Sequence, residues 1–315
     1  MNRRSILGAI AAASLVPQAA RGGGREYRAP RTRDGQPDLQ GIWTNASYTR
    51  LERPKIFDRL VITPEEARVA EAAIDRTGNA AGQVDPLGQK ESEFWEIGDG
   101  FARVRGEIRT SWIVDPANGR LPLRPEIVER FHYDDPTYET PMDNPEERSV
   151  TERCVASEGG YPPNLNSPDG NFLQILQTRD SVVLVAEKFN DARIVRLGDR
   201  SHAPAAVRSW AGDAIGWWER ETLVIESTNF SASGFSRFGR LKISADATVT
   251  ERFTRTGPSA LLYEFTVADP TAYTQTWRAE MPFLASKVPM YEYACHEGNY
   301  FLGPALAHAR EVERR

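Results

Sequence analysis

Three residues near the C-terminus have side chains that do chemistry in other proteins. The segment "YEYACHEGNYF", residues 291–301, places Cys295, His296 and Glu297 side by side. Cysteine and histidine bind metals, and histidine and glutamate exchange protons. Because neighbours in an extended segment point to opposite faces, Cys295 and His296 do not easily share one ion. We therefore predict no bound metal, while a metal-dependent enzyme that uses His202, His296 and Glu297 stays open as an alternative.

A glutamate within a predicted strand is the first candidate for acid/base catalysis. In "ATVTERFTR", alternation places Glu251 on the same face as Val249 and Phe253. A carboxyl group enclosed by apolar side chains has a raised pKa, which suits proton transfer near neutral pH. The sequence thus predicts Glu251 as the catalytic acid or base. The alternative is an ion pair with an interior arginine such as Arg252 or Arg278.

Two histidines are candidate proton-transfer partners for that glutamate. His202, in "LGDRSHAPAAV", lies in a loop between two predicted strands, from which a side chain can face the mouth of a barrel. His296, together with Glu297, is the other candidate, and its alternative is a structural hydrogen bond that orders the C-terminal segment. The predicted catalytic set is Glu251, His202, His296 and Glu297.

Aromatic side chains in the β-rich region predict a binding cavity for an apolar ligand. The expected lining residues are Trp210, Trp218, Tyr263 and Trp277. Large aromatic side chains around a cavity can enclose a small hydrophobic or aromatic molecule, although they can equally fill a core. No sequence pattern typical of phosphate loops, dinucleotide folds or zinc proteases is present, so no cofactor is expected. The chain has 39 basic and 44 acidic residues, so its net charge is negative. Nucleic acid, whose phosphates bind basic surfaces, is therefore not an expected partner.

The elements that would position these residues are mostly strands. About ten predicted strands, including one over residues 206–210, follow one another beyond Cys154 at short spacing and without intervening helices. This pattern predicts a mainly β protein whose antiparallel meander closes into a lipocalin-like β-barrel. The N-terminal third is expected to be irregular and partly helical. "TPEEARVAEAAIDRTG" predicts a helix near residues 64–76, with Thr63 and Glu66 as a capping box.

The start of the chain predicts export. Residues 1–20 combine Arg3 and Arg4 with an apolar run and small residues, which is typical of an export signal peptide and resembles the twin-arginine type. Residues 21–36 are a predicted linker, and 37–315 a single barrel domain with an N-terminal extension. The expected location is periplasmic or secreted, without stable membrane insertion after cleavage. There Cys154 and Cys295 are predicted to form a disulfide, since oxidising compartments preserve such bonds.

Motifs along most of the chain resemble a family of exported bacterial proteins. The matching segments include "DGQPDLQGIW", "IVDPANGRLPL", "TVTERF" and "YEYACHEGNY". The resemblance implies export and carries over no mechanism. "WERET" departs from the expected "W-E-G-D-T", which puts the tightness of that hairpin in doubt. Gly41-Ile42-Trp43 also resembles the opening of lipocalin-type barrels, in which the tryptophan closes the base.

These features together predict an exported protein that binds a small hydrophobic or aromatic molecule. The expected reaction is cofactor-independent acid/base chemistry of the isomerase, lyase or hydratase type. A non-catalytic periplasmic carrier is the alternative from a different class.

Overall fold

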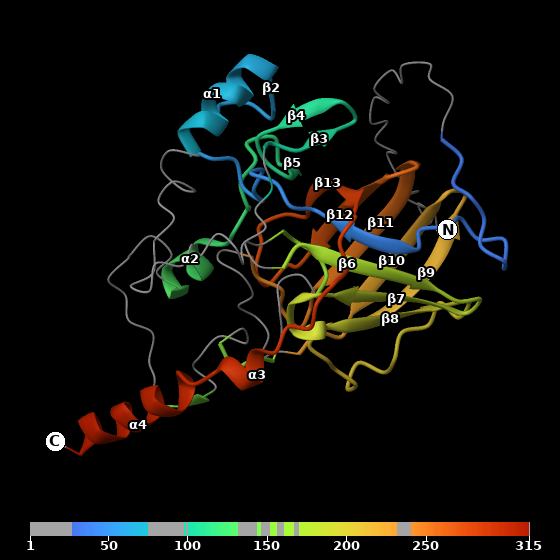
Figure 1. Cartoon of the computed structure of the whole chain (residues 1–315). Helices are drawn as coiled ribbons and strands as arrows, with labels where there is room; N and C mark the ends of the chain where they lie inside the picture. Colours follow the sequence, from blue (N-terminus) through green and yellow to red (C-terminus); the bar gives the residue numbers. More distant parts are fainter. Residues whose placement is uncertain are drawn as a thin grey trace, which may run out of the picture.

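The computed structural model describes residues 27–74, 98, 100–131, 144–145, 152–155, 161–166, 170–231 and 241–314. The predicted signal peptide and the first part of the predicted linker lie outside these ranges. The described chain is mainly β, as predicted, and Figure 1 shows most of its strands gathered into one barrel. The barrel strands are β1 (Gly41–Thr44), β6 (Phe172–Gln177), β7 (Ser181–Ala186), β8 (Ala192–Leu197), β9 (Asp213–Glu219), β10 (Thr222–Thr228), β11 (Thr248–Gly257), β12 (Ala260–Ala268) and β13 (Trp277–Ala285).

The first barrel strand closes the wall. β1 is hydrogen-bonded to β6 on one side and to β13 on the other, so that Trp43 lies opposite both Leu173 and Ala285. The side chain of Trp43 is buried, and its indole N–H donates to the carbonyl of Leu39 at 2.9 Å. The guanidinium of Arg255 lies 5.5 Å from the centre of its ring. The closed wall confirms the predicted barrel and is compatible with a lipocalin-like arrangement.

One strand pair departs from the predicted meander. β8 and β9 pair in parallel, with Arg196 opposite Ile215, whereas the other barrel pairs are antiparallel. Parallel neighbours need a connection that returns to the starting end of the wall. Residues 198–212, which we call the crossover, make that return. The prediction of a strand over residues 206–210 is therefore wrong.

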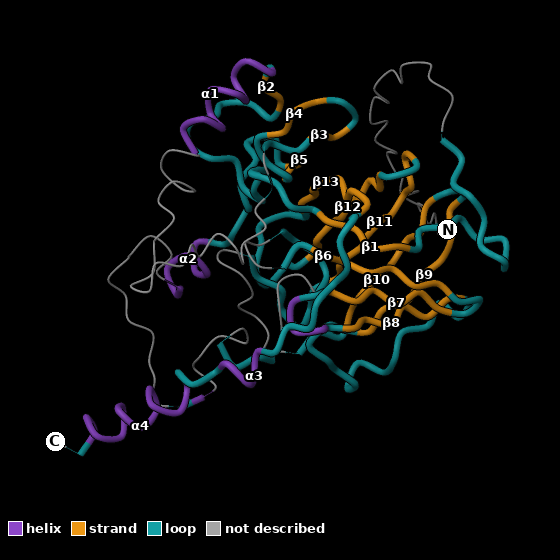
Figure 2. The backbone as a smooth tube through the Cα atoms, in the orientation of Figure 1, coloured by secondary structure: helices purple, strands orange, loops and turns teal. Residues whose placement is uncertain are grey.

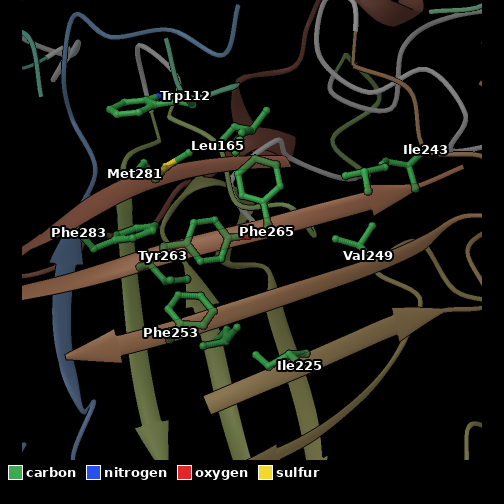
Figure 3. Close-up of a cluster of buried hydrophobic side chains, with 14 of the residues drawn as sticks. Trp112, Leu165, Ile225, Ile243, Val249, Phe253, Tyr263, Phe265, Met281 and Phe283 are labelled. Atoms are coloured by element: carbon green, nitrogen blue, oxygen red, sulfur yellow. The ribbon is translucent and has the colours of Figure 1, made fainter. Parts of the chain in front are cut away.

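The interior of the barrel is packed with side chains from alternate positions of the strands. Figure 3 shows the rings of Phe253, Tyr263, Phe265 and Phe283 converging from three neighbouring strands. The ring centres of Phe253 and Tyr263 are 4.6 Å apart, and those of Tyr263 and Phe265 are 5.3 Å apart. Such contacts are typical of a close-packed core.

The N-terminal third contributes small elements that pack beside the barrel. These are β2 (Val61–Ile62), α1 (Pro64–Ile74), β3 (Arg103–Val104), β4 (Glu107–Arg109), β5 (Ile113–Asp115) and α2 (Pro125–Phe131). The predicted capping box is confirmed, because Thr63 Oγ1 accepts from the Glu66 amide and Glu66 Oε2 accepts from the Thr63 amide. The predicted helix is confirmed as far as residue 74, and residues 75–76 lie outside the described ranges. β5 extends the wall beside β13.

The hairpin in "WERET" is tight despite its missing glycine. Glu219 pairs directly with Thr222, so only two residues form the turn between β9 and β10. Arg220 takes a left-handed conformation with φ of 57°. Non-glycine residues adopt this conformation at some energetic cost, which the long ladder of the hairpin offsets.

The C-terminal segment leaves the barrel and is fastened by a disulfide. Figures 1 and 2 show the short helix α3 (Cys295–Gly298) and the helix α4 (Leu302–Glu313), with α4 running away from the strands. The predicted bond between Cys154 and Cys295 is confirmed, and it joins residues 141 positions apart. Neither helix contains a buried residue.

Candidate functional site

Glu251 lies inside the barrel and is held by two partners. Its side chain is fully buried on β11, on the same inward face as Val249 and Phe253, as alternation predicts. Both carboxylate oxygens accept from the guanidinium of Arg193 on β8, with Oε1 at 2.8 Å from Nη2. The hydroxyl of Tyr263 donates to Oε1 at 2.7 Å. The ion pair foreseen as the alternative therefore exists, but with an arginine other than the two considered.

Further hydrogen bonds extend this buried network. The backbone N–H of Asn164 donates to the Tyr263 hydroxyl at 3.0 Å. The side-chain Oδ1 of Asn164 accepts from Arg193 at 3.0 Å. Ser227 on β10 accepts from the same guanidinium at 3.3 Å. Burial tends to lower the pKa of Arg193, but the adjacent Glu251 carboxylate outweighs it and leaves the pKa raised. The network holds a charged arginine against a carboxylate.

The side chain of Tyr263 keeps its proton. Burial, together with the neighbouring carboxylate, raises the pKa of Tyr263 well above its usual value. Tyr263 is therefore a neutral hydrogen-bond donor to Glu251. Because each oxygen of Glu251 already accepts a hydrogen bond, the arrangement suits cross-linking of the barrel wall better than proton abstraction from a ligand.

The four aromatic residues predicted to line a cavity do not form one surface. Tyr263 and Trp277 are fully buried, and Trp277 packs edge-on against Phe265 with ring centres 5.6 Å apart. Trp218 packs against the same core. Trp210 instead lies in the crossover, where it packs near Tyr161. A role in ligand binding for these four residues stays a prediction.

His202 lies on the outer face of the barrel. Its Nδ1 is 2.8 Å from Asp213 Oδ2, and its Nε2 is 3.2 Å from Glu226 Oε1. Glu226 alternates with the inward residues Ile225 and Ser227 along β10, so it points outward. The barrel wall consequently separates His202 from Glu251. The structure does not bring this predicted pair together.

His296 and Glu297 are exposed on α3. The segment was expected to be extended, but it forms a helical turn that begins at Cys295, whose sulfur is engaged in the disulfide. Within the part of the chain that the structure describes, no three His, Cys, Asp or Glu side chains gather as metal ligands. His202, His296 and Glu297 are therefore not assembled into one centre.

The disulfide borders an open hollow of about 540 Å³ on the surface. Its lining residues come from both ends of the disulfide-linked region: Glu152, Glu292, Tyr293, Ala294, Cys295, Gly298, Asn299 and Phe301. Asn299 fixes one wall, because its side-chain amide donates to the Glu152 carbonyl at 2.7 Å. The ring of Tyr293 packs edge-on against that of Phe189, with ring centres 5.2 Å apart.

Lys242 is a buried residue that no sequence motif singles out. Lys242 is almost fully buried, and its backbone amide and carbonyl both bond to the hydroxyl of Tyr273. Burial lowers the pKa of Lys242 to about 7. In "RLKIS", Lys242 stands between Leu241 and Ile243, so the alternation of a strand would place it on the opposite face from these apolar residues. Residues 241–244 instead lie outside the strands of the structure, and all four are buried.

Arg193 is likewise not singled out by a motif, although its position in a predicted strand indicates that it is buried. In "ARIVRL" it shares a face with Val195, and both residues are buried. The alternation that placed Glu251 inside the barrel applies equally to this arginine. Arg252, one of the partners considered, points outward and pairs with Glu219 at 2.9 Å.

No known protein family, curated protein or solved structure matches this chain. Membership of the exported family that its motifs resemble stays a prediction. Among the helices that the structure describes, none has the length and apolar character needed to cross a bilayer.

Proposed function

We propose that this protein is an exported, non-catalytic carrier of a small aromatic molecule, and that the hollow beside the disulfide is the binding site. The observation that carries the proposal is the combination of a hollow of about 540 Å³ with the rings of Tyr293 and Phe301 in its lining. Binding sites for small molecules have volumes of roughly 300–1,000 Å³ and are rich in aromatic side chains.

Exposed aromatic side chains next to the hollow support the same proposal. Tyr291 is 70% exposed, Tyr300 is 80% exposed and Phe301 is 54% exposed. Several large apolar side chains gathered on one short segment mark a surface that gains free energy by contact with an apolar partner. A planar ligand would stack on these rings and remove them from water.

The disulfide supports a location outside the cytoplasm and a preformed site. A bond between Cys154 and Cys295 persists in oxidising compartments. It also holds the two halves of the lining at a fixed separation before a ligand arrives, which lowers the entropic cost of binding.

The carrier is favoured over the predicted isomerase or lyase because of how Glu251 is held. A general base must reach the proton that it removes, whereas the carboxylate of Glu251 is fully buried and bonded to Arg193 and Tyr263. These groups cross-link strands of the barrel from the inside.

A fluorescence titration tests the proposal with N-phenyl-1-naphthylamine, a neutral aromatic probe. We expect saturable binding at one site per chain. The variant Phe301→Ser should weaken binding by about tenfold, which corresponds to the loss of one aromatic contact. Val69→Ser is the matched control, because Val69 is a 61% exposed apolar residue on α1, remote from the hollow.

Two results would contradict the proposal. One is the absence of saturable binding, and the other is an equal loss of affinity in Phe301→Ser and Val69→Ser. Mass spectrometry of a molecule that co-purifies with the protein then separates carrier from enzyme. A carrier returns that molecule unchanged after prolonged incubation, whereas an enzyme alters it.

A further inference from the structure

The crossover folds back along the outer face of the barrel, and His202 anchors it there. Its ring is placed between two carboxylates from different strands, Asp213 on β9 and Glu226 on β10. A neutral imidazole has a single N–H and donates one hydrogen bond, whereas an imidazolium donates from both nitrogens. Only the protonated ring can therefore donate to both carboxylates at once.

Of the two carboxylates beside His202, that of Asp213 is held in place and stays ionised. Burial tends to raise its pKa, but the hydrogen bond from the Ala203 amide, together with His202 and Arg196, outweighs burial and lowers the pKa of Asp213. Both carboxylate oxygens accept from Arg196, at 2.8 and 2.9 Å. Asp213 thus stays ionised over the pH range in which an ordinary histidine titrates.

Other charged groups of the crossover are engaged elsewhere. The carboxylate of Asp199 accepts from the Ser201 amide at 2.9 Å, and the guanidinium of Arg200 lies 3.8 Å from the ring centre of Trp217. Glu226 is the more exposed of the two carboxylates at the ring, with 37% side-chain exposure against 17% for Asp213. The bond to Glu226 is therefore the one that opens most readily.

We propose that His202 is a proton-controlled latch on the crossover. In the protonated state the ring bridges β9 and β10 and holds the crossover against the wall. As the pH rises and the ring loses its proton, one nitrogen becomes an acceptor that faces a carboxylate oxygen. The bridge to Glu226 is lost, and the crossover opens more often near residue 202.

The opposite end of the crossover stays attached when the latch opens. Trp210 packs with Tyr161 and Val155, directly after the disulfide-bonded Cys154. The carbonyl of Ser209, close to that end, also accepts from the Ser231 amide at 2.8 Å. The expected motion is therefore a local opening of the segment around residues 199–205, without unfolding of the barrel.

Hydrogen exchange of the full chain, followed by mass spectrometry, tests the latch. The measurements are made at about pH 5.5 and about pH 8.5, on either side of the range in which histidine ordinarily titrates. After correction for the intrinsic effect of pH, we expect amides of residues 199–205 to exchange about tenfold faster at the higher pH, as for the loss of one charged hydrogen bond. Peptides from β11 and β12 should show no such difference.

Three variants separate the latch from a purely structural contact. His202→Gln should exchange rapidly at both pH values, so the pH difference disappears. Glu226→Gln keeps the bond from Nδ1 to Asp213 and should reduce the difference. His308→Gln changes an exposed histidine on α4 and should leave it intact.

The latch is overturned if the wild-type protein shows equal corrected exchange at both pH values. It is also overturned if His202→Gln or Glu226→Gln retains the full difference. Because Glu226 is partly exposed on the outer face, Glu226→Gln is expected to fold and so provides a decisive result where His202→Gln is unstable.

Discussion

Arg193 and Glu251 meet across the interior of the barrel, from strands β8 and β11 that are separated by two strands in the wall. The side chain of Arg193 is 2% exposed and that of Glu251 is fully buried. Such a pair contributes little net stability by its own attraction, but removal of one partner leaves a buried, unpaired charge. This asymmetry makes the pair a sensitive test of its role.

Glu251→Gln should lower the free energy of unfolding by about 3–5 kcal/mol, because the charge on Arg193 loses its counter-ion inside the barrel. Urea denaturation measures the change. The double variant Arg193→Met with Glu251→Leu should recover most of it, since apolar residues of similar size replace both charges. Arg252→Met is the control, and loss of its exposed pair with Glu219 should cost at most about 1 kcal/mol. A loss in Glu251→Gln no larger than in this control would show that the buried pair is unimportant.

Reduction of the disulfide should release the C-terminal segment before the barrel unfolds. The described residues of α3 and α4 include no buried side chain, so few contacts remain to hold them once the bond is broken. Limited proteolysis with and without a reductant should show much faster cleavage between residues 287 and 300, with the barrel core retained. The double variant Cys154→Ser with Cys295→Ser should be cleaved as rapidly without reductant. Equal cleavage of the oxidised and reduced wild-type protein would contradict this prediction.

Lys242 should make stability rise with pH in the alkaline range. Its pKa is about 7 in the folded protein, below its ordinary value of 10.5. Between these values the unfolded chain binds a proton that the folded protein does not, so the free energy of unfolding increases with pH by at most about 1.4 kcal/mol per unit. Below about pH 7 this dependence disappears, because both states are protonated. Urea denaturation across this range should show a smaller slope in Lys242→Met, whereas the exposed control Lys287→Met should keep the wild-type slope.

The capping box of α1 should contribute about 1 kcal/mol to the free energy of unfolding. Thr63→Ala removes the acceptor for the Glu66 amide and should lower the free energy of unfolding by that amount. Thr63→Ser retains a hydroxyl and should be close to the wild type. An equal loss in the two variants would assign the effect to packing of the threonine methyl group instead.

Period-two alternation predicted most of the fold and the burial of Glu251. It works because a strand has one face toward the core, so local residue order determines which side chains are enclosed. The disulfide followed from cysteine count and predicted export. The same rule, applied to basic residues, would have identified Arg193.

The crossover could not be predicted in this way. The position of His202 between Asp213 and Glu226 depends on how a loop folds over the outside of the wall, which strand alternation does not encode. The parallel pairing of β8 and β9 is non-local for the same reason. The hollow combines residues from both ends of the disulfide, so its lining is likewise a property of the assembled fold.

Closure of the wall by β1 has a consequence for biosynthesis. Trp43 pairs with Ala285, so the barrel cannot close until Ala285 has left the ribosome. Until then the nascent protein presents two open sheet edges, and contacts of such large sequence separation form slowly. A route that carries proteins across a membrane after folding, as the twin-arginine type of signal does, would allow this late step to finish before transport.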